Sequence, residues 1–325
     1  MPHLFDRVAG LALTMPNPGT MIFPEGWGDP DLVGAFTRLD QPARPAAIDM
    51  VWQPKTEHRG YRRRRGSFAS PISDLLPDDA HQVPVELTEP AAASERLVVL
   101  LPSWNDEGFE SRRLFAESLA ARRVATLAAN IPLYGRRRRR NTSGMPIRTV
   151  ADFGVMGLGA VIEAEAIVNA LSGVYRQIGV GGFSMGGNLA ALVSARSILP
   201  LATGLMAASH SPGPVYLEGT LRHAISWKAL GGREARQRLS DLLEGVSALS
   251  LPPRDHHRAA VAVAARSDGF VPASSSAALA DHWTGSELRW LPGGHATLWR
   301  KHRHALVDAI VDSFDRLEVQ RSSSS

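Results

Sequence analysis

A serine stands between two glycines at residues 182–186, where the sequence reads Gly-Phe-Ser-Met-Gly. A short apolar run at 178–181 precedes this motif, and a helix-forming run follows it. This order predicts a strand, a tight turn and a helix, with Ser184 exposed at the turn. Glycines suit the flanks because neighbours carrying a Cβ would clash within such a strained turn. Ser184 could therefore be a nucleophile, with the Met185 N–H and the helix N-terminus stabilising a developing oxyanion.

A serine hydroxyl becomes a competent nucleophile when a histidine takes its proton and a carboxylate orients that histidine. Downstream, the apolar run 260–265 predicts a buried strand that ends just before Asp268. A second predicted strand, 288–291, leads into a glycine-rich loop that carries His295. The order Ser, Asp, His is that of the α/β-hydrolase fold, and parallel strands bring their carboxyl ends to one edge. We predict that Ser184, Asp268 and His295 form a catalytic triad.

A second oxyanion donor is expected in the loop after the predicted strand 97–101, where the sequence reads Pro-Ser-Trp-Asn-Asp. The backbone N–H of Trp104 is the first candidate, and that of Ser103 is the alternative. The weaker candidates for the acid do not follow an apolar strand; they are Asp241, Asp255 and Asp281. The weaker candidates for the base lie on the last predicted helix; they are His302 and His304.

From residue 97 onward, predicted strands alternate with predicted helices, which indicates an α/β fold with a mostly parallel central sheet flanked by helices. Helices are expected at 109–121, 151–171, 185–198 and 303–317, and further strands at 124–128 and 204–207. The first 82 residues or so form an arm rich in Pro, Gly and Arg, with edge strands at 66–70 and 84–87.

Residues 211–258 break the alternation and contain short amphipathic pieces joined by glycines. Since they lie between a core strand and the acid-bearing strand, we expect a helical cap over the active-site edge. His210, Tyr216 and Trp227 are expected to line a substrate pocket under it. The serine-rich end, 320–325, is expected to be disordered.

The composition limits the classes of function. A chain of 325 residues with 44% hydrophobic residues fits a single α/β domain with insertions. The absence of cysteine excludes disulfides, thiolate metal sites and thiol catalysis. No apolar run approaches the ~18 residues of a membrane span, and the N-terminus lacks signal-peptide features, so a cytoplasmic protein is expected. No metal or organic cofactor is expected, and the sequence leaves the oligomeric state open.

The net charge is only +4, which does not favour a nucleic-acid partner, but arginines are clustered. Two runs, 62–65 and 136–140, would most simply be solvated loop faces. The second run follows the predicted strand 124–128 and so belongs to the edge expected to carry Ser184. A basic rim there would attract an anionic substrate or an anionic membrane surface. Its members are Arg136, Arg137, Arg138, Arg139 and Arg140.

Several segments together resemble the α/β-hydrolase domain-containing protein 18 family. They are spread along the chain at 23–30, 66–71, 131–137, 182–187, 268–272 and 291–295. The resemblance implies that the first 82 residues belong to the hydrolase domain rather than to a separate module. It also implies a serine hydrolase, with lipid esters as one plausible substrate class.

The residues themselves indicate acyl transfer from a carboxylic ester through an acyl-enzyme. Thioesterases, peptidases and acyltransferases use the same triad, and sequence alone does not separate them. A catalytically silent protein that retains the hydrolase fold for binding is the alternative from another class. The intact Ser-Asp-His set argues against that alternative.

Overall fold

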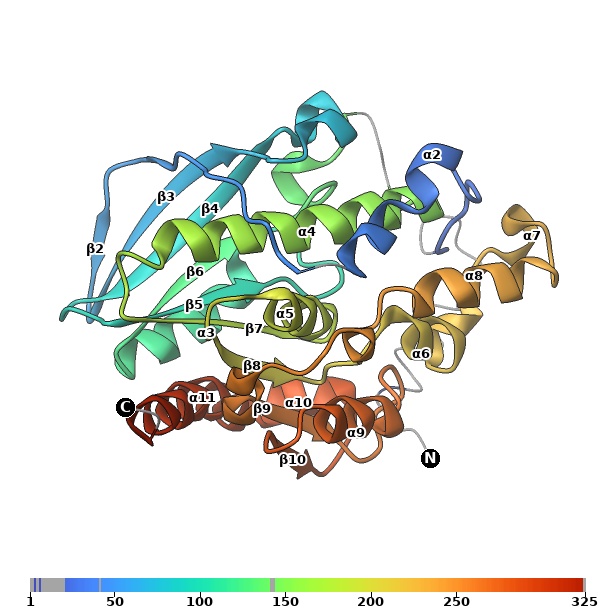
Figure 1. The fold of residues 1–325 in the computed structure, drawn as a ribbon. Coiled ribbons are helices and arrows are strands. Elements are labelled where there is room, and N and C mark those ends of the chain that lie inside the picture. Colours follow the sequence, from blue (N-terminus) through green and yellow to red (C-terminus); the bar gives the residue numbers. More distant parts are fainter. Residues whose placement is uncertain (1–2, 4–5, 7–20, 41, 141–143, 324–325) are drawn as a thin grey trace.

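A computed structural model describes the chain except for residues 1–2, 4–5, 7–20, 41, 141–143 and 324–325 (Figure 1). The described residues form a ten-stranded sheet in the order β1-β3-β4-β6-β5-β7-β8-β9-β10, with β2 paired to β3. Strands β6, β5, β7, β8, β9 and β10 are parallel, whereas the pairings among β1, β3, β4 and β6 are antiparallel. The predicted α/β-hydrolase fold class, with its mostly parallel sheet flanked by helices, is confirmed.

The strands of the parallel part match the apolar runs of the sequence. Along β5, Leu97, Val99 and Leu101 face one hydrophobic core while Val98 and Leu100 face the other, because successive side chains alternate across a strand. The strands are β1 (Val51–Trp52), β2 (Thr56–His58), β3 (Tyr61–Ala69), β4 (Gln82–Pro90), β5 (Arg96–Leu101), β6 (Val124–Ala129), β7 (Gln177–Phe183), β8 (Ala202–Met206), β9 (Val261–Ala265) and β10 (Glu287–Leu291).

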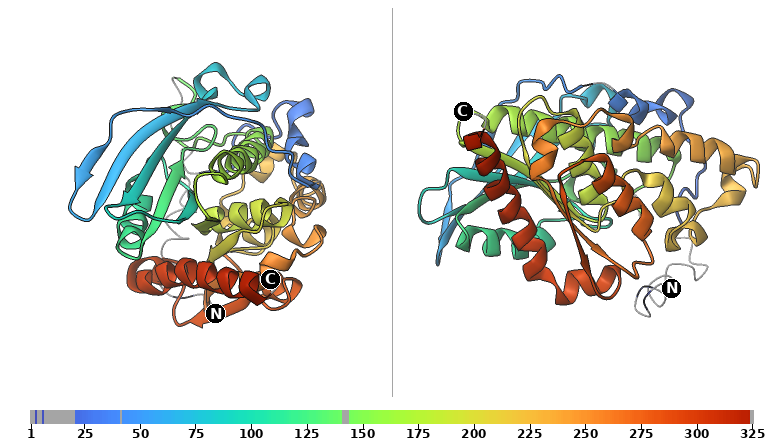
Figure 2. Two further views of the ribbon diagram at one scale, coloured as in Figure 1. Left: turned by 60° about the vertical axis from the view of Figure 1, so that its left-hand side comes forward. Right: turned by 60° about the horizontal axis from the view of Figure 1, so that its bottom comes forward.

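Helices cover both faces of the sheet. Helices α3 and α11 lie on one face and α4 and α5 on the other (Figure 2). Side chains of α3 and α11 belong to one hydrophobic core, and those of α4 and α5 belong to the other. The helices are α2 (Pro30–Val33), α3 (Glu110–Ala121), α4 (Val150–Leu171), α5 (Met185–Arg196), α6 (Pro212–Leu217), α7 (Trp227–Leu230), α8 (Ala235–Glu244), α9 (Ala273–His282), α10 (His295–Lys301) and α11 (Arg303–Ser323).

Helix α4 is long and apolar enough to cross a membrane by length and composition, which the sequence analysis did not anticipate. Its 18-residue apolar window is 72% buried inside the protein. A capping box at its start, formed by Thr149 and Asp152, satisfies the first free backbone N–H groups. Its apolarity is accounted for by packing between the sheet and the segment that precedes β1.

The segment 211–258 consists of helices α6, α7 and α8 with short 3-10 turns, and it lies beyond the sheet (Figure 1). The chain near residue 22 packs against it. Ile22 forms a parallel bridge with Ile225, and the Trp27 indole N–H donates to the carbonyl of Leu230 at 2.9 Å. The arm and the cap are therefore in direct contact. Most of the first 20 residues lie outside the described part of the chain.

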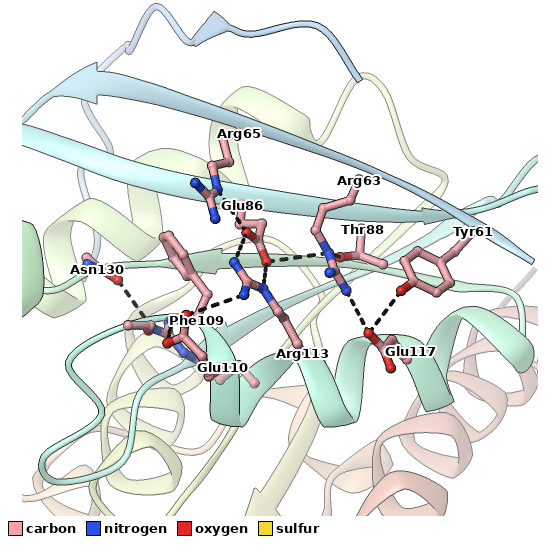
Figure 3. A network of polar contacts seen from close by, with 12 residues as sticks. Tyr61, Arg63, Arg65, Glu86, Thr88, Phe109, Glu110, Arg113, Glu117 and Asn130 are labelled. Atoms are coloured by element: carbon pink, nitrogen blue, oxygen red, sulfur yellow. Dashed lines mark hydrogen bonds and ion pairs between the residues drawn. The ribbon is translucent and has the colours of Figure 1, made fainter. Parts of the chain in front are cut away.

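The arginine run 62–65 lies on strand β3 and not in a loop. Because strand side chains alternate, Arg63 and Arg65 point toward α3, while Arg64 stacks on Trp52 with 4.3 Å between the guanidinium carbon and the ring centre. Glu86 on β4 is the buried acceptor of this network and takes two hydrogen bonds of 2.6 Å from Arg113 (Figure 3). Through Arg63 and Arg65, the run forms ion pairs that join the antiparallel strands to α3.

The second run, 136–140, is only partly at the surface, and the prediction is wrong for Arg137. Its guanidinium is completely buried and donates two hydrogen bonds, of 2.6 and 2.7 Å, to the carboxylate of Glu163 on α4. A charge buried in this way must be paired, so Arg137 is unavailable to an external anion. Three neighbours also have acidic partners: Arg138 with Glu107, Arg139 with Asp152 and Arg140 with Asp79.

The prediction of a disordered end at 320–325 is wrong for its first four residues. Helix α11 continues to Ser323, and the Gln320 side-chain amide donates to the carbonyl of Asp255 at 2.7 Å. The apolar positions of the same helix are buried against the sheet, which fixes its direction. Residues 324–325 lie outside the described part of the chain.

Candidate active site

Ser184 occupies the turn between β7 and α5. Its backbone has φ 57° and ψ −118°, a region that residues with a side chain rarely adopt. Its N–H donates to the carbonyl of Met206 on β8 at 2.8 Å, and its carbonyl accepts from Asn188 at 3.1 Å. The neighbouring strand and the first turn of α5 thus hold the strained residue in place from both sides.

The glycines of the motif are required by close packing of the main chain. A Cβ on Gly186 would overlap the carbonyl oxygen of Leu101 at the end of β5. A Cβ on Gly182 would overlap the backbone of Gly186 itself. Both positions therefore accept only a hydrogen as side chain, which is the reason given for them from the sequence.

Asp268 and His295 form a hydrogen-bonded pair. The distance from Asp268 Oδ2 to His295 Nδ1 is 2.7 Å, and the two side chains are 3% and 13% exposed. The other carboxylate oxygen, Oδ1, accepts from the backbone N–H groups of Phe270 at 2.8 Å and Val271 at 2.9 Å. The carboxylate is therefore fixed by three donors and can hold the imidazole in one orientation.

The environment of His295 favours its protonated form. Burial lowers the pKa of His295, but the charge and hydrogen bond of Asp268, together with the charge of Asp6, outweigh burial and raise that pKa above its ordinary value. Two aromatic rings also pack on the imidazole, with ring centres 4.8 Å away for Phe183 and 5.2 Å for Phe270. The ring is thus held between apolar walls, with the Asp268 carboxylate at its Nδ1 atom.

The structure brings His295 next to the turn that carries Ser184. Its ring packs on Phe183, and Phe183 is the residue that directly precedes this serine. The side chains of Ser184 and His295 both lie in the described part of the chain. In this conformation the Ser184 hydroxyl makes no hydrogen bond to the His295 imidazole. Such contacts are often long without substrate and tighten in the reactive complex.

A cavity opens beside Ser184 with a free volume of about 50 Å³. Aromatic rings form much of its wall: Tyr216 packs against Trp104 at 5.8 Å and against Phe153 at 5.3 Å between ring centres. The full lining is Trp104, Phe153, Ser184, Met185, Asn188, Ser209, Ser211, Pro212, Val215, Tyr216, Leu221 and Val271. The lining comes from the loop after β5, from α4 and α5, and from the cap.

Of the three residues predicted to line the pocket, Tyr216 does so, whereas His210 and Trp227 are outside this lining. The His210 ring bonds through Nδ1 to the Ser247 hydroxyl at 2.9 Å, and burial lowers its pKa. Trp227 lies on α7 with the Arg236 guanidinium 5.9 Å from its ring centre. Both residues hold the cap together, a role that their residue types alone do not distinguish from lining a pocket.

The two candidates for the second oxyanion donor are in different places. Trp104 lines the same cavity as Ser184 and Met185. Ser103 instead lines a separate, smaller cavity together with Phe183. Of the two candidates, only Trp104 therefore lines the cavity beside Ser184.

Sequence reasoning missed one residue of the site, Asp6. Its carboxylate is buried and accepts hydrogen bonds from the backbone N–H groups of Gly269, His295 and Ala296. A single aspartate in an irregular arm gives no local signal of such a role. Within the described residues, no group of three or more His, Asp or Glu side chains is arranged to hold a metal ion.

The fold and this site define the class: a strand–serine–helix turn, an Asp–His pair on the following loops and a mostly parallel sheet are features of the α/β-hydrolases. Residues 20–251 and 232–316 match the family described as alpha/beta hydrolase domain containing 18. The chain belongs to this family and is a hydrolase, which confirms the resemblance seen in the sequence.

Solved structures of low sequence identity are similar to this chain, and the two with a TM-score of 0.50 or more share its fold. Acetyl xylan esterase 1 from Thermoanaerobacterium sp. JW/SL YS485 is 11% identical with a TM-score of 0.55, covering 92% of this chain and 99% of that one. The acylaminoacyl peptidase of Pyrococcus horikoshii is 11% identical with a TM-score of 0.50, covering 82% and 41%. A cold-adapted esterase from an Arctic intertidal metagenomic library is 19% identical with a TM-score of 0.47, covering 80% and 99%.

Proposed function

We propose that this hydrolase cleaves carboxylic esters through an acyl-enzyme on Ser184. The observation that carries the proposal is the 2.7 Å hydrogen bond between buried Asp268 and His295, packed against the residue that precedes the turn serine. A serine at a strained strand–helix turn, with such a pair beside it, has the parts that nucleophilic acyl transfer requires.

In the first step, Ser184 Oγ attacks the ester carbonyl carbon while its proton passes to His295 Nε2. The negative charge on the carbonyl oxygen is stabilised by the backbone N–H groups of Met185 and Trp104. The alcohol leaves with the proton from the imidazolium, and the acyl group remains on the serine. Water then attacks the acyl-enzyme carbonyl and gives one proton to His295, which passes it to Ser184 Oγ as the acyl–oxygen bond breaks and the acid is released. Asp268 keeps the imidazole in the productive tautomer throughout.

The cavity beside Ser184 favours a small acyl group. A bound water needs roughly 10–15 Å³ of such free volume, so about 50 Å³ is the space of only a few water molecules. A long-chain lipid ester would require the cap segment carrying Tyr216 to move aside. We therefore place short-chain esters first and lipid esters second, with thioesters, peptides and acyl transfer as chemistries that the same residues would serve.

Hydrolysis of nitrophenyl esters of increasing acyl length, together with labelling by a fluorophosphonate, tests the proposal. Replacing Ser184 by alanine should lower kcat by about 10⁶-fold and abolish labelling, because no other group can form the acyl-enzyme. The control is Ser118→Ala on the exposed side of α3, which should keep full activity. Persistent labelling of the Ser184 variant, or an unlabelled and inactive wild-type protein, would refute the proposed nucleophile.

A further inference from the structure

The carboxylate of Asp6 connects the two loops that carry the acid and the base. Its Oδ2 accepts from the backbone N–H of Gly269 at 2.9 Å and of His295 at 2.7 Å. Its Oδ1 accepts from the N–H of Ala296 at 3.1 Å. These partners are 263, 289 and 290 positions away in the sequence, so the contact is entirely tertiary.

The surrounding chain is shaped to receive this carboxylate. A Cβ on Gly294 would overlap Asp6 Oδ2, so the glycine before His295 makes room for the carboxylate. Nearby, the His3 backbone N–H donates to the carbonyl of Ser267 at 2.9 Å, next to Asp268. Asp6 itself is fully buried, and burying an ionised carboxylate is unfavourable unless several donors surround it. The three N–H groups meet that requirement.

The bonds fall on the main chain of the reacting residues themselves. His295 and Ala296 begin helix α10, and their N–H groups have no partner within the helix. Gly269 directly follows Asp268. One carboxylate therefore sets the distance between the backbone of the acid and the backbone of the base. A displacement of about 1 Å in such a pair costs roughly 10²-fold in rate.

We propose that Asp6 is a positioning residue for the esterase reaction, fixing the His295 loop against the Asp268 loop and adding a second negative charge near the imidazolium that forms during acyl transfer. The inference rests on the proposed function for its kinetic consequence. Its structural part, the alignment of the imidazole by a carboxylate from the arm, does not depend on which ester is cleaved.

The charge of Asp6 has a predictable direction of effect. Asp268 and Asp6 are the charged groups that raise the pKa of His295 against the effect of burial. The other neighbours are the uncharged rings of Phe183 and Phe270, which contact the imidazole, and His3, which lies against Gly294. Removing the charge at position 6 should therefore lower the pKa of the imidazole. A residue that only held the fold together would not shift this pKa.

The test compares Asp6→Asn with Asp31→Asn, which removes an exposed carboxylate from α2. Asp6→Asn should lower kcat by about 10- to 100-fold, leave KM nearly unchanged and move the acidic limb of kcat/KM to lower pH. Asp31→Asn should change none of these. If kcat and the acidic limb of Asp6→Asn match those of the wild type, the inference is wrong.

A second variant, Asp6→Ala, leaves a hole that small carboxylates can fill. Formate should restore its kcat saturably, whereas formamide and chloride should not, and equal rates with and without formate would overturn the inference. Nuclear magnetic resonance titration of His295 separates the two proposals. If wild-type protein cleaves no ester but Asp6→Asn still lowers the His295 titration midpoint, the proposed function fails and the positioning role stands.

Discussion

The two halves of the candidate site are held in place by different means. Ser184 is fixed locally: its strained backbone, the adjacent strand β8 and the glycines at 182 and 186 hold the turn. Asp268 and His295 lie on loops, and their relative position depends on Asp6, more than 260 residues away in the chain. The candidate nucleophile is thus placed by packing of neighbouring backbone, whereas the candidate acid–base pair is placed by long-range hydrogen bonds.

This difference predicts that changes in the two halves will fail in different ways. A change in the nucleophile's half should disturb packing and activity together, because the turn is part of the close-packed sheet. A change in the acid–base half should alter activity and its pH dependence while the fold remains. Three measurements examine this contrast, from the largest expected effect to the smallest.

Replacing Asp268 by asparagine should lower kcat by about 10⁴-fold with little loss of stability. The amide is nearly the same size, but it no longer stabilises the imidazolium and favours the wrong tautomer of His295. Ester hydrolysis and thermal unfolding of the same preparation measure both quantities. Asp281→Asn, at an exposed position on α9, is the matched control and should behave as wild type. A loss below tenfold in Asp268→Asn would remove this residue from the triad.

Replacing Gly186 by alanine should damage packing and catalysis together. The new Cβ meets the Leu101 carbonyl oxygen, so the turn must shift, at a cost of about 1–3 kcal/mol in the free energy of unfolding and roughly 10²-fold in kcat. Urea denaturation and ester hydrolysis measure the two effects. The control is Gly157→Ala in α4, where a Cβ meets no atom within 4 Å and should be neutral or stabilising.

If Gly186→Ala kept both its stability and its rate, the turn would not depend on close backbone packing. The proposed difference between the two halves of the site, close packing around Ser184 and long-range hydrogen bonds around Asp268 and His295, would then be wrong. Equal destabilisation in the Gly157 and Gly186 variants would lead to the same conclusion, because the two positions differ mainly in the atoms around a new Cβ.

The sequence predicts the locally determined part of this molecule well. The turn motif, the apolar runs that became β5, β7 and β9, and the helices that follow them depend on residues close together in the chain. Asp268 and His295 were located because each follows a strand, and the structure pairs them. Their pairing with Ser184 in a working triad stays a prediction until activity is measured.

Features decided by distant partners were beyond sequence reasoning. Arg137 lies in a run of five arginines and is buried because Glu163 of α4 faces it. The run at 62–65 is a strand because Glu86 and Trp52 supply partners for its alternating side chains. Asp6 belongs to the same group. In each case the residue type is unremarkable, and its role is set by an element that the local pattern does not identify.

The smallest predicted effect is the pH dependence of the wild-type enzyme. His295 must be neutral to accept the Ser184 proton, and Asp268 and Asp6 raise its pKa above the ordinary 6.5 or so in spite of burial. The acidic limb of kcat/KM should therefore have its midpoint above about 6.5, with at least about fourfold less activity at pH 6 than on the plateau.

The contrast between the two halves of the site is clearest in the variants, in the pH midpoint of the acidic limb of kcat/KM. The residual activity of Gly186→Ala should keep the wild-type midpoint, because that change leaves both carboxylates beside His295 in place. Asp268→Asn should move the midpoint to lower pH, since it removes the nearer negative charge. A profile that stays flat down to pH 6 in the wild type, or a midpoint that moves equally in both variants, would contradict the assignment of His295 as the base. The midpoint reports only the environment of the imidazole, so it distinguishes a displaced nucleophile from a disturbed base even where two variants lose activity to the same extent.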